Sequence, residues 1–263
     1  GDVYKRQGYI PCEAAVKEVS EIAKLSNIHI KSIFTHFAKA DYKDKTFAEK
    51  QFHEFKEFIS QLEEVGVHIP IHQCANSAAM MEMKETSMNL ARAGISMYGL
   101  YPSEEMDHEA MKLEQAMSIY SHVVHVKEIK AGRGISYGQT FIAEKNMKIA
   151  TIPIGYGDGY PRNLSNKGYV LIGGQKADIV GRVCMDQFMV DVTGLDVQVG
   201  DKVTLAGRDG KEEILIDNLA VLAGTFNYEF VCDLGKRIPR VYLKNGQIVG
   251  MKDYYDDDYE INI

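Results

Sequence analysis

The first part of the chain alternates between the hydrophobic spacing of helices and that of strands. Apolar residues recur every three or four positions across residues 46–65, and this pattern stops at Gly66, which suits a left-handed helix cap. The whole pattern predicts helices at 13–26, 46–65 and 77–85 and strands at 28–34, 67–72 and within 89–100. Such alternation predicts parallel strands joined by crossover helices. A closed barrel of this type needs eight strands and about 250 residues, so three strands leave either a small open sheet or a chain without its front half.

From about residue 115 onward, short strands rich in Val and Ile are separated by Gly-Gly and Asp-Gly turns, which is typical of an all-β domain. The strands are expected at 121–129, 149–154, 169–172, 177–183, 189–192 and 202–206, with one helix at 216–223. The predicted fold class is therefore α/β in residues 8–114, followed by all-β in residues 115–252. Residues 1–7 lack periodicity and are interpreted as a non-native scar, and the acidic residues 253–263 as a solvated tail.

Composition narrows the class of protein to which the chain could belong. With 263 residues, 45% of them hydrophobic, it can form a sizeable core, and its net charge of −7 argues against a nucleic-acid partner. The four cysteines are scattered, with no Cys-x-x-Cys pair and no histidine at metal spacing, which indicates no metal site and a reducing compartment. The longest apolar runs are far shorter than the roughly 20 residues that cross a bilayer, and no signal peptide opens the chain. We therefore expect a cytoplasmic protein without membrane contact.

The stretch 74–99 carries the strongest local indication of chemistry. Each of its ends is an apolar run followed by small polar residues and glycine, as where a strand enters a loop that holds phosphate on backbone N–H groups. Arg92 stands where a lone guanidinium could face a ligand. Taken singly such signals are weak, because a Gly-Ile pair after an arginine is usually a strand end and a lone histidine or tyrosine is usually structural.

Seven motifs nevertheless follow one another along the chain. They are Phe34-Thr35-His36-Phe37-Ala38-Lys39-Ala40-Asp41, Ala75-Asn76-Ser77-Ala78-Ala79, Arg92-Ala93-Gly94-Ile95, Ile135-Ser136-Tyr137-Gly138, Ile154-Gly155-Tyr156-Gly157-Asp158-Gly159-Tyr160, Gly181-Arg182-Val183-Cys184-Met185-Asp186-Gln187 and Arg237-Ile238-Pro239-Arg240. In this order they resemble the motifs of bacterial alanine racemases, over roughly residues 8–245.

The resemblance implies a fold, a cofactor and an assembly. Members join a (β/α)8 TIM-type barrel to a β-rich C-terminal domain, so the chain is expected to hold the C-terminal part of the barrel followed by the β-domain. Members bind pyridoxal 5'-phosphate, work as homodimers whose active sites are shared between subunits, and interconvert L- and D-alanine to supply peptidoglycan synthesis. No lysine here has the surroundings of the family's Schiff-base lysine, so we expect a chain that lacks the family's N-terminal part and that lysine.

The resemblance also implies roles for individual residues. Racemisation by two-base proton transfer on a pyridoxal phosphate aldimine needs a base on each face, one being the absent lysine and the other Tyr137 of the second subunit. His36 and Arg92 are implied to form the network that makes Tyr137 basic. The other implied roles are cofactor contacts at Ser77, Arg92, Gly94 and Ile95, substrate contacts at Met185 and Asp186, and an entrance lined by Asp41, Tyr156 and Arg182.

Two positions depart from the family pattern. Gln73 stands where many members have a histidine, which leaves the support of Arg92 open, and Lys236 replaces a tyrosine near the cofactor phosphate. Because the size of the substrate pocket is not readable from these residues, a racemase for serine or another small amino acid is an alternative. An inactive fragment is a third reading.

Overall fold

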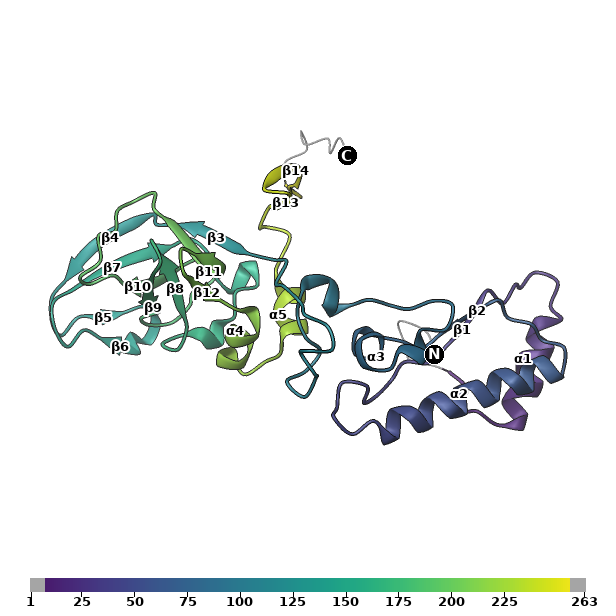
Figure 1. Ribbon diagram of the computed structural model, residues 1–263. Coiled ribbons are helices and arrows are strands. Elements are labelled where there is room, and N and C mark those ends of the chain that lie inside the picture. The colour runs from purple at the N-terminus through teal and green to yellow at the C-terminus, as the bar shows by residue number, and fades with distance from the viewer. Residues whose placement is uncertain (1–7, 256–263) are drawn as a thin grey trace. The chain divides into compact units, whose positions relative to one another are not determined.

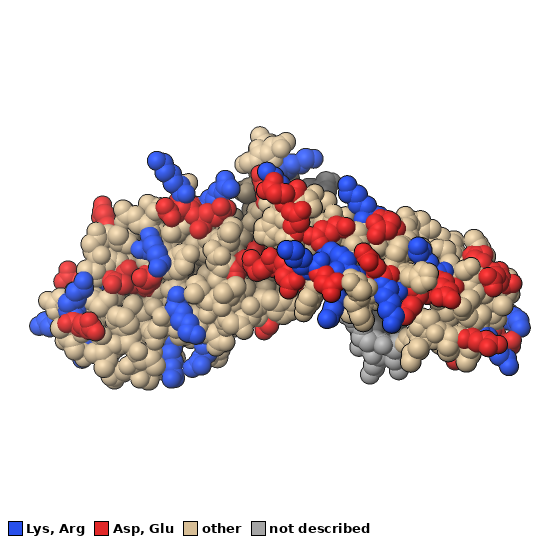
Figure 2. Space-filling view, turned by 60° about the horizontal axis from the view of Figure 1, so that its bottom comes forward, with Lys and Arg blue, Asp and Glu red and all other residues tan. Residues whose placement is uncertain are grey.

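The computed structural model describes residues 8–255 and divides into two compact units, with the division between Ala116 and Met117 (Figure 1). The hydrophobic pattern changes at nearly the same place, about residue 115. Residues 1–7, interpreted as a scar, and residues 256–263 of the acidic tail lie outside the described residues. On the face shown in Figure 2, basic and acidic side chains are interspersed.

The first unit has the predicted order of helix and strand. Strands β1 and β2 are parallel, with Ser32 opposite Ile71 and Phe34 opposite Gln73, and helix α2 connects them. This confirms the predicted parallel pairing, although each strand has three residues instead of six or seven. The elements are α1 (Glu13–Ala23), β1 (Ser32–Phe34), α2 (Thr46–Glu64), β2 (Ile71–Gln73), α3 (Ser77–Glu82) and two 3₁₀ helices, η1 (Lys84–Ser87) and η2 (Ile95–Tyr98).

The strand predicted within 89–100 is wrong. Only Leu90 pairs with β2, through one parallel bridge to Gln73. Beyond it, the N–H groups of Gly94 and Ser96 both donate to Ser77 Oγ, so they are not available to a β-ladder, and the chain turns into η2. The predicted helix 77–85 also ends early, at Glu82, because the next residue leaves helical geometry.

Apolar side chains between the helices form the core of the first unit. Met81 and Met83 are each 3% exposed, and Met80 packs against the same cluster. A second cluster joins α1 to α2 and β2, and contains Val16, Phe58, Leu62 and Ile69 among others. Gly66 ends α2 at φ +81°, which confirms its predicted role as a left-handed cap.

The second unit is built from antiparallel sheets, as the glycine-punctuated strands predict. One sheet has the order β10-β7-β4, and another has the order β12-β11-β8-β9 with β3 beside β11. The bounds are β3 (Ile119–His122), β4 (His125–Ile129), β5 (Gly134–Ile135), η3 (Tyr137–Gln139), β6 (Phe141–Ile142), β7 (Met147–Ile152), η4 (Tyr156–Asp158), η5 (Arg162–Leu164), β8 (Tyr169–Ile172), β9 (Gln175–Asp178), β10 (Phe188–Asp191), β11 (Lys202–Asp209), β12 (Glu212–Ile214), α4 (Ile216–Ala223), α5 (Asn227–Asp233), β13 (Arg240–Lys244) and β14 (Gln247–Lys252).

The predicted strand 121–129 is two strands in two different sheets. Val123 N donates to Asp201 O beside β11, and Val124 N donates to Thr151 O of β7. The chain therefore passes from one sheet to the other within two residues. Helix α4 has the predicted bounds, whereas α5 and the β13–β14 hairpin were not predicted.

Residues 8–255 contain neither a membrane-spanning helix nor a metal-binding cluster. Of their helices, none is both long and apolar enough to cross a membrane. Their His, Cys, Asp and Glu side chains form no group that could hold a metal ion.

Candidate functional site

Arg92 lies where strands β1 and β2 end, and three segments hold its side chain. Its Nη1 donates to Gln73 Oε1 at 2.8 Å, and its Nη2 donates to Thr35 O at 3.0 Å and lies 3.3 Å from His36 Nδ1. The guanidinium also lies over the Phe34 ring, 5.2 Å from its centroid. Because a guanidinium can only donate, His36 Nδ1 must accept, which places the proton of a neutral imidazole on Nε2. The predicted pair of His36 and Arg92 is thus brought together.

Gln73 is a site residue whose role the sequence left open. Its side-chain oxygen accepts from Arg92, and its amide nitrogen lies 3.4 Å from Ser32 Oγ, which fixes the orientation of the amide. The departure from the family's histidine is therefore accommodated, since glutamine supplies an acceptor at the same place. An uncharged acceptor leaves the positive charge of Arg92 uncompensated.

Burial shifts the pKa of two neighbouring groups. Desolvation lowers the pKa of the Arg92 guanidinium from its ordinary value, although an arginine in a protein stays charged. Desolvation raises the pKa of the Cys74 thiol to about 11, and the thiol donates to Thr86 O at 3.0 Å. Cys74 is therefore a buried structural thiol beside the arginine.

Ser77, Gly94 and Ser96 form a cradle of donors at the start of α3. Ser77 Oγ receives the N–H of Gly94 at 2.9 Å and that of Ser96 at 3.3 Å, and lies 3.1 Å from Ser96 Oγ. Asn76 caps α3 by accepting from Ala79 N at 3.0 Å. The structure thus brings the predicted Ser77, Gly94 and Ile95 together. Ser96 was missed, and its hydroxyl two positions after the glycine is the signal that could have revealed it.

The cradle is built from the donor types of an anion site. Ser77 is only 3% exposed, and a Cβ placed on Gly94 would lie 3.5 Å from Ser77 Oγ, in van der Waals contact with it. Converging backbone N–H groups and hydroxyls are the donors that hold phosphate in proteins. The residue types therefore fit the phosphate of the expected cofactor, which would replace Ser77 Oγ as the acceptor of the Gly94 and Ser96 N–H groups.

In the second unit, four of the predicted residues belong to two loops that contact each other. Tyr156 N donates to Cys184 O at 3.0 Å and Gly157 N donates to Met185 O at 2.7 Å, which joins the loop of Tyr156 to the segment that carries Arg182, Met185 and Asp186. Tyr156 and Met185 are 44% and 57% exposed. The structure therefore presents these side chains at one surface.

Asp158 holds the Tyr156 loop and was not singled out from the sequence. Its carboxylate accepts from Gly155 N at 2.9 Å and lies 3.2 Å from Arg237 Nε. Tyr137 follows the short strand β5, is 71% exposed, and lies in η3. Asp41, predicted to share the entrance with Tyr156, belongs to the first unit, where its carbonyl accepts from Ser103 Oγ at 2.6 Å.

Lys236 takes the position where the family has a tyrosine. Its ammonium lies 5.2 Å from the centroid of the Tyr254 ring, which Lys252 also approaches at 4.4 Å. These two cations lower the pKa of the Tyr254 phenol, chiefly through the Lys252 hydrogen bond. An aromatic ring is therefore present beside Lys236, although it comes from a later residue.

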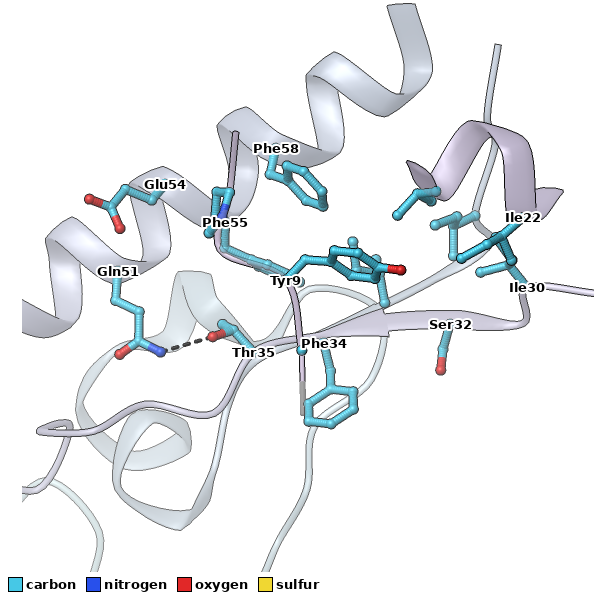
Figure 3. Close-up of a pocket in the computed structure, with 15 residues that line it drawn as sticks. Tyr9, Ile22, Ile30, Ser32, Phe34, Thr35, Gln51, Glu54, Phe55 and Phe58 are labelled. Atoms are coloured by element: carbon cyan, nitrogen blue, oxygen red, sulfur yellow. Dashed lines mark hydrogen bonds between the residues drawn. The ribbon is translucent and has the colours of Figure 1, made fainter. Parts of the chain in front are cut away.

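A separate cavity of about 650 Å³ lies between α1, β1 and α2 (Figure 3). Its walls are mostly apolar and include Tyr9, Phe55 and Phe58, while Gln51 Nε2 donates to Thr35 Oγ1 at 2.8 Å along one side. None of the predicted site residues lines it. The cavity is therefore separate from the cradle, although it shares Phe34 and Thr35 with the surroundings of Arg92.

Two family models match the chain. The family model of the alanine racemase N-terminal domain matches residues 2–102, and that of the alanine racemase C-terminal domain matches residues 116–242. Because the N-terminal model matches, N-terminal-domain sequence is present, and the expectation of a chain lacking that part is not supported.

Curated relatives match nearly the whole chain. Alanine racemase 1 of Clostridium acetobutylicum is 44% identical over 250 residues, which are 95% of this chain and 65% of that protein. The alanine racemase of Methanococcus maripaludis is 48% identical over 239 residues, 90% of this chain and 64% of that protein. The chain thus spans slightly less than two thirds of the length of these relatives.

Solved structures show the same fold. A structure of alanine racemase from Clostridium difficile 630 matches with a TM-score of 0.89 and 40% identity, over 96% of this chain and 65% of that one. A second, in complex with cycloserine, matches with a TM-score of 0.87 and 40% identity, over 94% and 65%. This confirms the predicted fold class, a barrel domain followed by a β-rich domain. By sequence and by structure, the chain belongs to the alanine racemase family.

Proposed function

We propose that this chain belongs to a cytoplasmic, pyridoxal-phosphate-dependent isomerase that interconverts L-alanine and D-alanine and supplies D-alanine for peptidoglycan. The observation that carries this proposal is the convergence of Ser77 Oγ with the N–H groups of Gly94 and Ser96, next to a guanidinium held at the ends of β1 and β2. Family membership and the exposed Tyr137 support the same function.

The cradle would hold the cofactor phosphate through Ser77 and the backbone at Gly94, Ile95 and Ser96. Bound pyridoxal phosphate supplies an electron sink that makes the α-hydrogen of an amino acid acidic. Arg92 would donate to the ring nitrogen. Because its guanidinium does not give up a proton, it would leave that nitrogen unprotonated, and a weaker electron sink limits side reactions such as transamination.

Tyr137 would act as one of the two bases. A free phenol has a pKa of about 10, so a basic tyrosine needs donors and positive charge that stabilise its phenolate. His36 and Arg92, which lie 3.3 Å apart at Nδ1 and Nη2, would supply them. We propose that Tyr137 reaches the partner subunit's cofactor in a homodimer, a role that its 71% exposure suits.

Five other residues complete the proposed substrate path. Met185 and Asp186 would meet the substrate carboxylate, and Tyr156, Arg182 and Asp41 would line the entrance. Support comes from the hydrogen bonds that join the Tyr156 loop to residues 184 and 185. A narrow entrance would admit a small zwitterion such as alanine, and serine is the alternative substrate that an assay must separate.

Cofactor binding and racemisation test this proposal independently. Binding of pyridoxal phosphate to the chain is measured by calorimetry for the wild type, for Ser77→Ala and for Ser20→Ala, a control that removes a hydroxyl donating to Val16 O in α1. We expect Ser77→Ala alone to weaken binding, by about tenfold, because a charge-assisted hydrogen bond is lost. Equal affinity for pyridoxal phosphate in all three proteins would contradict the proposal that the cradle holds the cofactor phosphate.

Racemisation is measured in the complete gene product by chiral chromatography, with L-alanine and L-serine as parallel substrates. We expect D-alanine to form faster than D-serine. Absence of both products from a protein saturated with cofactor would refute the proposed activity. A visible absorbance band on adding pyridoxal phosphate to this chain alone would contradict the prediction that it lacks the Schiff-base lysine.

A further inference from the structure

The loop that carries Tyr137 has a backbone that serine rarely adopts. Ser136 has φ +62° and ψ −176°, a combination found almost only in glycine. Gly138 and Gln139 follow with φ +71° and +47°. A conformation of this kind persists only where surrounding contacts impose it.

The contacts that impose it come from residues 182–185, which we call the anchor segment. Ser136 Oγ donates to Arg182 O at 2.7 Å, and Cys184 Sγ lies 3.4 Å from Ser136 Oγ. Just before this segment, Gly181 lies directly against the loop, because a Cβ placed on it would come within 2.8 Å of Ile135 O and of Ser136 Cβ. The loop and the anchor segment are therefore in close contact at both backbone and side chain.

The other side of the loop is closed as well. The Arg182 guanidinium lies over Gly138, where an added Cβ would be 3.4 Å from its Cζ. Gln139 N donates back to Ser136 O at 3.2 Å, which closes the turn around Tyr137. The same anchor segment accepts from Tyr156 N and Gly157 N, so one segment positions both tyrosine loops.

We propose that Ser136 is a positioning residue for Tyr137, acting through the hydrogen bond from its hydroxyl to the Arg182 carbonyl. Within its own chain the Tyr137 ring is 71% exposed, so contacts inside that chain contribute little to the direction of the ring, and the backbone of residues 136–138 sets that direction instead. Alanine at 136 keeps the strain and loses the anchor. Glycine at 136 loses the anchor and is free of the strain. The inference rests on the proposed function, since it gives the orientation of Tyr137 a catalytic purpose.

The test separates anchoring from strain and from overall stability. Ser136→Ala, Ser136→Gly and the control Thr193→Val are compared; the control removes a hydroxyl that accepts from Lys148 N in the same unit. Amide hydrogen exchange is followed at Gln139, whose N–H reports on the turn, and in β11 as a reference. We expect both Ser136 variants to raise exchange at Gln139 by about tenfold and to leave β11 unchanged. Unchanged exchange at Gln139 in the glycine variant, which is compatible with the backbone and so expected to fold, would overturn the inference.

Kinetics of the complete gene product provide the second measurement. We expect both Ser136 variants to lower kcat by about tenfold with KM changed less than twofold, because the misplaced group is a base and not a binding group. Loss of kcat in Ser136→Ala that is fully restored in Ser136→Gly would overturn the anchor in favour of strain alone. If Tyr137→Phe racemises at the wild-type rate, the proposed function fails, while the exchange measurement still decides whether Ser136 holds the loop.

Discussion

Arg92 in the first unit and Tyr137 in the second are held in opposite ways. The Arg92 side chain is restrained at its tip, by Gln73, Thr35 and His36. The Tyr137 side chain is 71% exposed, and the restraint acts on the backbone beside it, at Ser136. The position of a side chain that is held at its end group depends on the chemistry of the neighbouring side chains. The position of a side chain that is held only through its backbone depends on the backbone geometry. Substitutions should therefore displace Arg92 when they remove a hydrogen-bond partner, and Tyr137 when they change the backbone beside it.

The largest expected effect is that of Tyr137→Phe on catalysis. Because the ring is exposed, removing its hydroxyl should leave the free energy of unfolding unchanged, while loss of a general base should lower the racemisation rate by about 10²–10⁴. The α-hydrogen of one enantiomer should still exchange with solvent, because the other base is untouched. NMR in D₂O measures exchange and inversion together, and Tyr120→Phe, a tyrosine 47% exposed in β3, is the control. Loss of exchange from both enantiomers would argue against a one-face role.

Gly181→Ala should break the backbone restraint in the second unit. At φ +83° an alanine is strained, and its Cβ would meet Ile135 O at 2.8 Å, so the free energy of unfolding should fall by about 2–4 kcal/mol. Gly132→Ala is a matched control, because φ there is +85° and nothing lies within 4 Å of the added Cβ. Denaturant titration should show a loss of about 1 kcal/mol for the control. Equal losses would show that contact with the Tyr137 loop does not matter.

Gln73→Leu should loosen the restraint on Arg92 in the first unit. A hydrogen bond to a charged group is worth about 1.5–3 kcal/mol when buried, and Gln73 is half-buried, so we expect cofactor affinity to fall by about tenfold. Gln73→His should recover most of that loss, since imidazole again offers an acceptor. Calorimetric titration with pyridoxal phosphate measures the effect, and equal affinity for the leucine and histidine variants would contradict it.

The smallest expected effect concerns Cys74, next to Arg92. Burial raises its pKa from 9.0 to about 11, so the folded state holds the thiol proton more tightly than the unfolded state does. This contribution is complete below pH 9 and is lost as the pH rises toward 11, by about 1 kcal/mol at pH 10. Denaturant titrations at pH 8 and pH 10 should show a loss that is smaller in Cys74→Ala. An identical loss in the variant would assign the effect to other groups.

The sequence pattern predicted correctly those helices whose bounds are determined by residues within the helix or at its ends. Helix α4 has the predicted bounds, and α2 ends before Gly66 as expected, because spacing and caps lie within the segment itself. The fate of residues 89–100 depends instead on Ser77, which is distant in sequence and takes the N–H groups of Gly94 and Ser96. A strand pattern cannot reveal a hydroxyl that competes for its donors.

The candidate site shows the same division. Resemblance of motifs predicted Arg92, Ser77 and Gly94, which the structure brings into two adjoining networks. It left the role of Gln73 open, because an amide in place of an imidazole can be judged only when the distance to Arg92 is known. Ser136 was quoted only as part of a motif, since its backbone angles depend on the contact with Gly181 and Arg182.

The passage of the chain between sheets at Val123 and Val124 has a mechanical consequence. The N–H of Val123 donates to Asp201 O beside β11, and the N–H of the next residue, Val124, donates to Thr151 O of β7, so no residue separates the two attachments. Because the two attachments are one peptide bond apart, a displacement of either sheet is transmitted directly to the other. The C-terminal unit should therefore melt as one cooperative block.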